Sequence, residues 1–325
     1  MNTNLQMSSP SVVSFKKRSK RIFNQLGMVI ILALLIIVMI IVAPNFTDSS
    51  NILNVLKQSS ITAILAAGMT VVILTGGIDL SVGSTLALSG VISVLLSNAG
   101  TPPVIAMLAG VAVGYVAGAI NGFLTAVPKL PSFIVTLGSM TYLRGVAYVI
   151  TGGYPVVLAS KQFKFIGAGD ILGVPTPIYV MAIVYIIMLI VLKYTMFGRH
   201  VYAIGGNEEA AHLTGIKVNR TLIHVYSISG LLAGVSGVVM AGRLFSGQPM
   251  VGIGFELDAI AAVVLGGTSF VGGRGRIQET IIGVLIVAVL TNGMTLLNVE
   301  YYWQQVVKGI VIVIAVLLDR LRSRT

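Results

Sequence analysis

Residues 16–43 read KKRSKRIFNQLGMVIILALLIIVMIIVA, with five Lys and Arg residues directly before 22 residues that carry no charge. An apolar stretch of about 20 residues is long enough to cross the hydrocarbon core of a bilayer as a helix. The run is longer than the roughly 7–15 residues of a signal-peptide core and has no small-x-small cleavage site before Pro44. It therefore predicts an uncleaved first membrane-spanning helix that begins in the cytoplasm, on the side of its basic residues.

Nine further apolar runs follow, and the whole chain has the composition of a membrane protein. The mean hydropathy is +0.97, and only 10% of the residues are charged, against about 25% in soluble domains. No loop has room for a soluble domain of about 50 residues, so any energy-converting domain belongs to another chain. The predicted fold is an all-α polytopic membrane protein with about ten transmembrane helices, at residues 22–43, 52–75, 81–97, 104–126, 133–150, 177–193, 221–241, 257–271, 280–297 and 305–318.

The basic residues predict the orientation of these spans. A ten-span path that starts in the cytoplasm places 15 of the 21 Lys and Arg residues inside, and only Lys161, Lys164 and Arg243 outside. This positive-inside bias also explains the net charge of +11 without nucleic-acid binding, for which the chain has no motif. We expect a basic cytoplasmic segment at 1–21, a transmembrane domain at 22–319 with a cytoplasmic loop at 194–220, and a basic cytoplasmic tail at 320–325.

A possible parallel internal repeat relates two turns of the chain. Residues 71–77 read VVILTGG and residues 263–267 read VVLGG, and each precedes a polar, glycine-containing turn and a helix. Under the ten-span path both units run from outside to inside and back, as parallel repeats of transporters do. Chance recurrence of Val and Gly in a membrane chain explains the match equally well.

Several chemistries are excluded by what the sequence lacks. Without cysteine it has no disulfide, thiol nucleophile or thiolate metal ligand. His200, His212 and His224 lie twelve apart, which does not bring them together on a helix face. We therefore expect no metal site and no catalytic residue. The chain also lacks a G-x-x-x-x-G-K-[ST] phosphate loop, so we expect that it is not itself an ATPase, that it holds no cofactor and that energy arrives through a partner.

A secondary transporter driven by protons or sodium is one function open to a chain of this kind. Such transporters carry carboxylates or histidines near the middle of the bilayer to bind the coupling ion. Every Asp and Glu here lies at a predicted span end or in a loop, which counts against ion coupling. Asp79 fits a cap on the helix that begins near Ser81, or a contact to a partner. Glu256 and Asp258 fit first-turn acids that complement a helix dipole, or contacts to a partner.

The cytoplasmic loop contains a short helix with both of its ends specified. Residues 207–216 read NEEAAHLTGI, in which Asn207 can cap the N-terminus. Gly215 can adopt the left-handed conformation that ends a helix, and Ile216 then contacts Ala211 in a Schellman ending. So short a helix is marginal in water and must pack on something, either the transmembrane helices of its own chain or the surface of another protein.

Glu209, Ala210, Ala211 and Gly215 match the E-A-A-x-x-x-G signature of permeases of ATP-binding-cassette importers. The stretches GMTVVILTGGIDLSVGS at 68–84, YAIGGNEEAAHLTGI at 202–216 and ELDAIAAVVLGGTSFVGGRGRI at 256–277 resemble the ribose permease family. The resemblance extends from Pro44 to Asp319. It implies a bacterial inner (plasma) membrane protein that moves a monosaccharide, most simply ribose, which a periplasmic sugar-binding protein delivers.

The resemblance also implies partners and coupling residues. The helix of the cytoplasmic loop would dock in a groove of a double-cassette ATPase, which binds ATP and Mg²⁺, and the permease would form a homodimer within the lipid bilayer. Arg274 and Arg276 satisfy the positive-inside bias, and their turn also suits contact with the ATPase. The expected ATPase-coupling residues are Asn207, Glu208, Glu209, Ala210, Ala211, Leu213, Gly215, Arg274 and Arg276.

Polar residues within spans are the candidates for a sugar path, because neutral sugars need donors and acceptors of hydrogen bonds rather than charges. Lys57, Arg144 and Lys308 lie in or at the edge of spans, where a charge must snorkel or pair. Arg144 is the deepest of these charges, so we include it, although snorkelling to the outer surface also explains it. The candidates are Asn121, Thr136, Thr141, Arg144 and Asn292.

Overall fold

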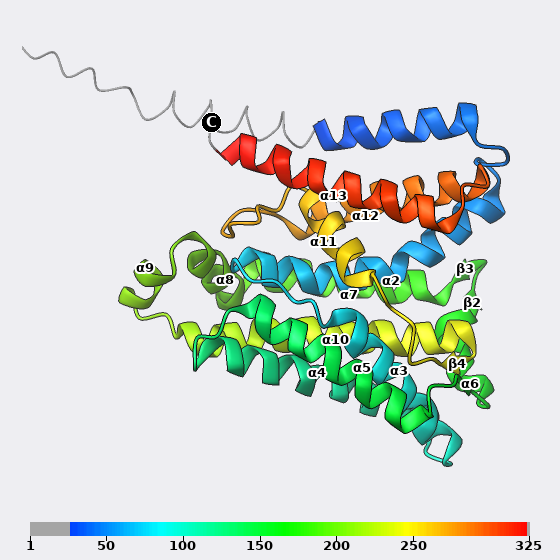
Figure 1. The fold of residues 1–325 in the computed structure, drawn as a ribbon, viewed down its shortest axis with the longest axis horizontal. Helices are drawn as coiled ribbons and strands as arrows, with labels where there is room; N and C mark the ends of the chain where they lie inside the picture. Colours follow the sequence, from blue (N-terminus) through cyan, green and yellow to red (C-terminus); the bar gives the residue numbers. More distant parts are fainter. Residues whose placement is uncertain (1–26, 324–325) are drawn as a thin grey trace, which may run out of the picture.

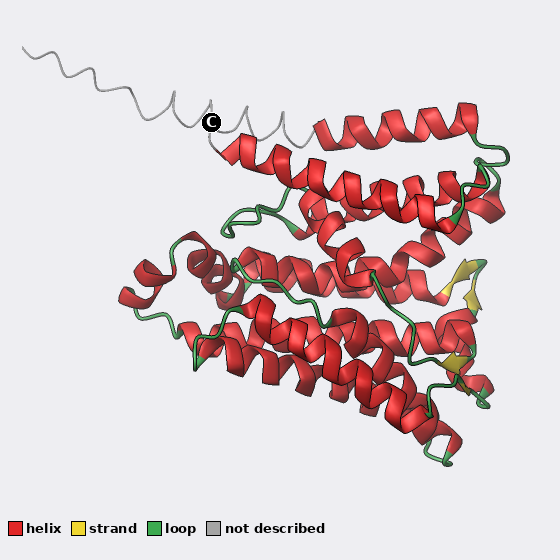
Figure 2. Cartoon of the chain, in the orientation of Figure 1, coloured by secondary structure: helices red, strands yellow, loops and turns green. Residues whose placement is uncertain are grey.

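The computed structural model describes residues 27–323, and most of them are helical (Figures 1 and 2). The basic segment 1–21 lies outside the described residues. The helices are Gly27–Val42, α2 (Ser49–Leu74), α3 (Val82–Asn98), α4 (Pro103–Ala126), α5 (Ser132–Thr151), α6 (Lys161–Ala168), α7 (Thr176–Tyr194), α8 (Met196–Gly206), α9 (Glu208–Leu213), α10 (Val218–Leu244), α11 (Phe255–Leu265), α12 (Ile277–Leu296) and α13 (Tyr301–Ser323).

The chain is a helical, multi-pass membrane protein. Among the described residues, six helices have the length and hydropathy of a membrane span, namely α2, α4, α5, α7, α10 and α12. Each of the other four predicted spans also contains a helix, but Gly27–Val42, α3 and α11 are shorter than a span of about 20 residues. The count of ten spans, their orientation and the internal repeat therefore stay predictions.

Helix α11 has only about half the length of a span, and its N-terminus meets the N-terminus of α3 inside the bundle. The predicted span 257–271 is helical only over Phe255–Leu265, because Gly266 and Gly267 end the helix, the latter at φ +84°. In Figure 1, α3 and α11 both begin near the middle of the molecule, where a Cβ on Gly83 would overlap the carbonyl oxygen of Gly252. Non-helical backbone at this depth is tolerated because protein surrounds it.

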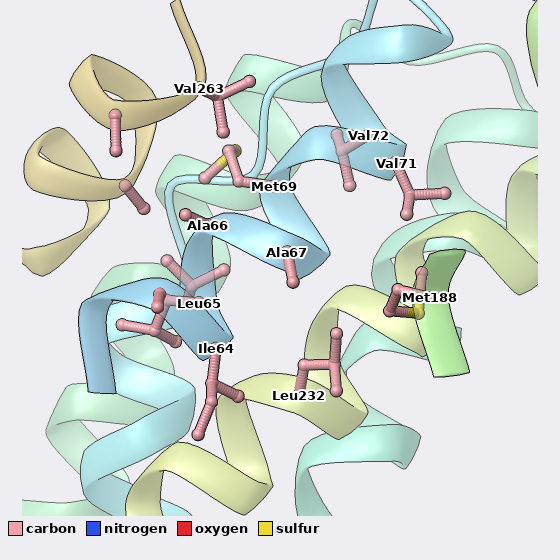
Figure 3. Close-up of a cluster of buried hydrophobic side chains, with 14 of the residues drawn as sticks. Ile64, Leu65, Ala66, Ala67, Met69, Val71, Val72, Met188, Leu232 and Val263 are labelled. Carbon is pink, nitrogen blue, oxygen red and sulfur yellow. The ribbon is translucent and has the colours of Figure 1, made fainter. Parts of the chain in front are cut away.

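Helix α2 forms the centre of the molecule, because its residues are apolar on every side. The side chains from Ser59 to Leu74 are nearly all buried. Figure 3 shows Ile64, Leu65 and Met69 of α2 with Met188 of α7, Leu232 of α10 and Val263 of α11 around them. Helices from both halves of the sequence thus pack on a single central helix.

Helices α4 and α10 approach each other closely through glycines. Gly110, Gly114, Gly118 and Gly122 recur every four residues on α4 and form one face. A Cβ on Gly114 would lie 2.9 Å from the backbone of Gly234 and would overlap the carbonyl oxygen of Gly230. Small residues at this spacing let two membrane helices pack backbone against backbone. We call this contact the glycine seam.

The two ends of the bundle differ. At one end, α8 and α9 project from the bundle, and we call this the α9 end (Figure 1). At the other end lie α6 and two short antiparallel ribbons, β1 (Val156–Val157) with β4 (Ser246–Gly247) and β2 (Asp170–Ile171) with β3 (Val174–Pro175). We call this the ribbon end. The loop 151–176 supplies most of it.

Candidate functional site

Helix α9 has the two ends that its sequence predicts. The Asn207 side chain accepts a hydrogen bond from the backbone N–H of Ala210 at 2.9 Å. Gly215 has φ +86°, and the backbone N–H of Ile216 donates to the carbonyl of Ala211 at 3.2 Å, which is the Schellman bond. Ala211 is buried against Ile204 and Val218. The chain's own α8 and α10 therefore supply the packing that this short helix needs.

The remaining surface of α9 is exposed. Glu208, Glu209, Ala210 and His212 are exposed, and Leu213 is 81% exposed although it is apolar. An exposed Leu beside two carboxylates, on a helix that projects from the bundle, is a surface that a partner could cover. The candidates Asn207, Glu208, Glu209, Ala210, Leu213 and Gly215 thus lie together on one exposed surface, with Ala211 beneath it.

The turn that carries Arg274 and Arg276 lies beside this loop. The backbone N–H of Gly273 donates to Leu74 at the end of α2, at 2.9 Å, and the Tyr202 hydroxyl of α8 donates to the carbonyl of Gly275 at 3.0 Å. Arg274 is exposed and Arg276 is half-buried, 4.0 Å from Glu279. The structure thus brings the two arginines to the α9 end, as predicted.

A buried carboxylate lies at the centre of a polar network inside the bundle. Asp79 is 0% exposed. Its Oδ1 accepts from the backbone N–H and the hydroxyl of Ser81, at 3.0 and 2.6 Å, and its Oδ2 accepts from the Ser229 hydroxyl at 2.8 Å. Ser229 lies near the middle of α10. As predicted, Asp79 lies in a turn near a span end, but the α2–α3 turn enters the bundle and buries the carboxylate, which the sequence did not predict.

The structure corrects the expected role of Asp79 as a cap on α3. The first residue before α3 is Ser81, and its side chain makes no capping hydrogen bond. Asp79 lies two residues further back and binds the backbone N–H of Ser81, so it fixes the turn that leads into α3. It also ties that turn to α10. Its position inside the bundle is too deep for contact with a soluble partner.

Two of the candidate path residues belong to the same network. Asn121 is fully buried; its amide donates to the Ser81 hydroxyl at 2.9 Å, and its carbonyl oxygen accepts from Ser139. Thr136 is also buried and donates to the carbonyl of Ile78 at 3.3 Å. Both side chains therefore contact the turn that precedes α3. Helix α5 contributes Thr136 and Ser139, and α4 contributes Asn121.

Arg144 holds the segment that leads into α11. Its Nη1 donates to the carbonyl of Val251 at 2.6 Å and also to that of Pro249. Its side chain is thus engaged within the protein, which differs from the snorkelling alternative. Glu256 in the first turn of α11 accepts from the backbone N–H of Gly254 at 3.1 Å. Arg144 therefore fixes the approach to α11 as Asp79 fixes the approach to α3.

The last two candidate path residues lie elsewhere. Thr141 is exposed on α5 and donates to the carbonyl of Leu137 in its own helix, at 3.1 Å. Asn292 of α12 exchanges two hydrogen bonds with Asn51 of α2, at 2.9 and 3.1 Å. They do not join the network around Asp79.

The first-turn acids of α11 are confirmed, and one of them pairs with a span lysine. Glu256 and Asp258 both lie in the first turn of α11. The Lys308 ammonium of α13 lies 3.1 Å from Asp258, and both side chains are largely buried. This ion pair thus offsets the free-energy cost of placing the charge of Lys308 in a predicted span.

The sequence analysis did not predict that four residues form a buried cluster, namely Asp79, Ser81, Ser139 and Ser229. The signal for it is weak, because Ser is common in membrane helices and Asp79 follows a Gly-Gly pair typical of surface turns. Among the described residues, no group of three His, Asp or Glu side chains could hold a metal ion.

Comparison with known proteins gives one consistent result. A family described as branched-chain amino acid transport system / permease component matches residues 51–316. The chain is 48% identical to the ribose import permease protein of Escherichia coli (strain K12) over 295 residues, 89% of this chain and 92% of the relative. It is 49% identical to that of Bacillus subtilis (strain 168) over 304 residues, 93% and 94% of the two chains. The D-allose transport system permease protein of Escherichia coli (strain K12) is 41% identical over 304 residues, 93% of each chain. No solved structure matches.

Proposed function

Because the chain belongs to the family of branched-chain amino acid transport system permease components, we propose that it is the permease of an ATP-binding-cassette importer for a monosaccharide, with ribose the leading candidate. The chain is a multi-pass inner-membrane protein and a transport permease component. Its similarity to ribose import permeases supports the choice of ribose. ATP hydrolysis as the energy source, the partner proteins and the roles of individual residues are part of the proposal.

The observation that carries the proposal is the exposed surface of α9. An amphipathic six-residue helix, capped at both ends and held rigidly on α8 and α10, projects from the bundle beside the Arg274 turn. A double-cassette ATPase that binds this surface would move α9 as one body with α10. Leu213 would be the apolar contact, and Glu208, Glu209, Arg274 and Arg276 would set the charge pattern around it.

The interior of the bundle favours a neutral substrate over an amino acid. Half-helix N-termini inside transporters commonly bind anionic groups of the substrate, because the helix dipole is positive there. Here each of the two N-termini has a carboxylate of its own protein beside it, Asp79 at α3 and Glu256 at α11. The carboxylate of an amino acid would be repelled, whereas the hydroxyl groups of a sugar can bind the surrounding Ser, Thr and Asn side chains.

We place the sugar path along the inner side of α5. Asn121, Thr136 and Arg144 contact the two segments that lead into α3 and α11. Thr141 lies on the exposed side of α5, where a second permease copy would cover it in the proposed homodimer. Asn292 lies outside this arrangement and stays a candidate by residue type only. A periplasmic sugar-binding protein would deliver the sugar at the ribbon end.

Reconstitution tests the proposed function. The permease, its ATPase and its binding protein are placed in proteoliposomes, and uptake of labelled D-ribose is measured with ATP and with a nonhydrolysable analogue. We expect uptake only when ATP is hydrolysed and all three proteins are present. Uptake by the permease alone in a proton or sodium gradient would instead support the secondary sugar transporter.

The buried Asp79 is the observation that favours this second candidate. A buried carboxylate can bind a proton or a sodium ion. The substitution Asp79→Asn separates the two readings, because the amide keeps an oxygen for Ser81 and loses the charge. An ATP-driven permease should keep much of its uptake, whereas a gradient-driven transporter should lose its dependence on the gradient.

A further inference from the structure

Three segments of the chain meet backbone against backbone at the α9 end, namely the turn between α2 and α3, the last turn of α8 and the turn between α11 and α12. A Cβ on Gly272 would lie 2.9 Å from the backbone nitrogen of Gly76 and 3.0 Å from the carbonyl oxygen of Gly205. A Cβ on Gly205 would overlap the carbonyl oxygen of Leu74, the last residue of α2. A Cβ on Gly273 would lie 2.9 Å from the carbonyl oxygen of Gly205. We call Gly76, Gly205, Gly272 and Gly273 the glycine junction.

Hydrogen bonds also hold the glycine junction together. The backbone N–H of Gly273 donates to the carbonyl of Leu74 at 2.9 Å, which ties the α11–α12 turn to α2. The Tyr202 hydroxyl donates to the carbonyl of Gly275 at 3.0 Å, which ties the same turn to α8. Backbones in direct contact cannot adjust by rotating a side chain, and close-packed protein transmits strain. The three segments therefore have little freedom to slide past one another.

The junction is also joined closely to α9. Asn207 belongs to both α8 and α9, because its backbone N–H donates to the carbonyl of Ala203 at 3.1 Å and its side chain accepts from Ala210 at 2.9 Å. Only residues 206 and 207 separate Gly205 from the first residue of α9. A movement of α9 therefore reaches the junction across a very short piece of chain that is hydrogen-bonded at both of its ends.

The two turns at the junction connect to the two helices that begin inside the bundle. Gly76 lies in the turn that carries Asp79 and continues into α3, and the path candidates of α4 and α5 bond that same turn. Gly272 lies in the turn that follows α11, and the backbone N–H of Thr268 in this turn donates to the carbonyl of Val263 in α11 at 3.2 Å. The junction thus contacts the start of α3 and, through its second turn, the end of α11.

We propose that the glycine junction transmits the movement of α9 to α3 and α11, with Gly205 and Tyr202 as positioning residues, an inference that rests on the proposed function. Coupling between distant sites is carried by packed contacts and rigid elements. A movement of α9 would shift both turns together, so both helices beside the proposed sugar path would change position in one step. A permease with a loosened junction would still bind its ATPase, which would hydrolyse ATP without moving sugar.

The experiment measures uptake of labelled D-ribose and ATP hydrolysis in proteoliposomes that contain the permease, its ATPase and its binding protein. Gly205→Ala adds a methyl group that must push α8 away from Leu74. Tyr202→Phe removes the bond to Gly275 without adding bulk, so it decides the test if Gly205→Ala does not reach the membrane. We expect both variants to take up less ribose per ATP hydrolysed, about fivefold less or more for Gly205→Ala, within the usual range of coupling between two sites. Copurification of the ATPase should stay unchanged.

Two matched controls lie outside the junction. Gly206→Ala changes the next residue of α8, where no atom lies within 4 Å of a Cβ. Tyr179→Phe removes a hydroxyl that donates to the carbonyl of Ile171 at 3.0 Å, at the ribbon end. Both controls should keep the wild-type ratio of uptake to hydrolysis. A wild-type ratio in every junction variant that reaches the membrane, or a fall of uptake and hydrolysis in proportion, overturns the inference. Absence of ATP-driven ribose uptake by the unaltered importer overturns the proposed function instead.

Discussion

The Ser229 hydroxyl donates a 2.8 Å hydrogen bond to Oδ2 of Asp79, across 150 positions of sequence. The bond joins the turn between α2 and α3 to the middle of α10. Asp79 is completely buried, so its carboxylate depends on protein groups for every hydrogen bond that water would otherwise supply. The position of α3 therefore depends on this small set of hydroxyl donors.

Ser229→Ala should destabilise the permease, because it leaves Oδ2 of Asp79 buried with no donor among the described residues. The expected cost is about 1–3 kcal/mol, measured as a lower midpoint of thermal unfolding in detergent. Ser227→Ala is the matched control, since Ser227 is also buried on α10 and bonds only the carbonyl of Ile223 in its own helix, at 2.8 Å. Equal effects of the two substitutions would show that the network contributes nothing to stability.

Gly114→Ala should disturb the glycine seam. The added methyl group meets the backbone of Gly230 and Gly234, which cannot rotate away as a side chain could. Overpacking of this kind costs about 1–3 kcal/mol, so we expect a lower unfolding midpoint and less protein in the membrane.

Gly145→Ala on α5 is the control for the seam, because no atom lies within 4 Å of a Cβ at that position. It should be neutral or slightly stabilising, since Ala is the better helix former. If Gly114→Ala is as well tolerated as Gly145→Ala, the two helices do not depend on backbone contact.

Gly215→Val should abolish ATP-driven uptake while the protein stays folded in the membrane. No atom lies within 4 Å of a Cβ there, so the substitution acts only through the backbone. A β-branched residue at φ +86° costs at least about 1–2 kcal/mol, enough to redirect the end of α9. The measurements are ribose uptake and copurification of the ATPase at matched membrane levels.

Gly206→Val is the matched control in the same loop, since its surroundings are equally open and it does not have positive φ. Uptake and ATPase binding should survive it. Retention of both by Gly215→Val would mean that α9 is not the coupling element, and loss of the protein from the membrane would mean that the loop is structural.

Both termini should lie in the cytoplasm. The predicted path has an even number of spans, and its basic residues gather on the inner side. An alkaline phosphatase fused after Thr325 should be inactive, whereas one inserted in the loop 151–176 should be active and serves as the internal control. An active C-terminal fusion would contradict the ten-span path.

Sequence reasoning predicted those parts of the molecule that depend on local chemistry. Asn207 and Gly215 set the ends of α9 through their own side chain and backbone, and both are confirmed by the structure. Apolar runs predicted the helices for a similar reason. The depth of Asp79 was not predictable in this way, because it depends on the packing of its turn against Ser229 and Asn121, which lie far from it in the chain.

The interrupted span at 257–271 shows the same limit. Hydropathy continued the span at 257–271 through Gly266 and Gly267, because glycine is nearly neutral on such scales, whereas the helix ends at Leu265. Likewise, Arg144 was read as a single charge near a helix end. Its carbonyl partners at Pro249 and Val251 come from a segment that only the tertiary fold brings near α5.

Backbone contact along the glycine seam turns α10 into a stiff rod. The rod has 27 residues, so it is about 40 Å long at 1.5 Å per residue, and α4 lies against it to prevent bending. Helix α9 is joined to one tip by four residues, 214–217, and the β4 segment follows the other tip. A displacement of α9 would therefore be passed along α10 toward the ribbon end.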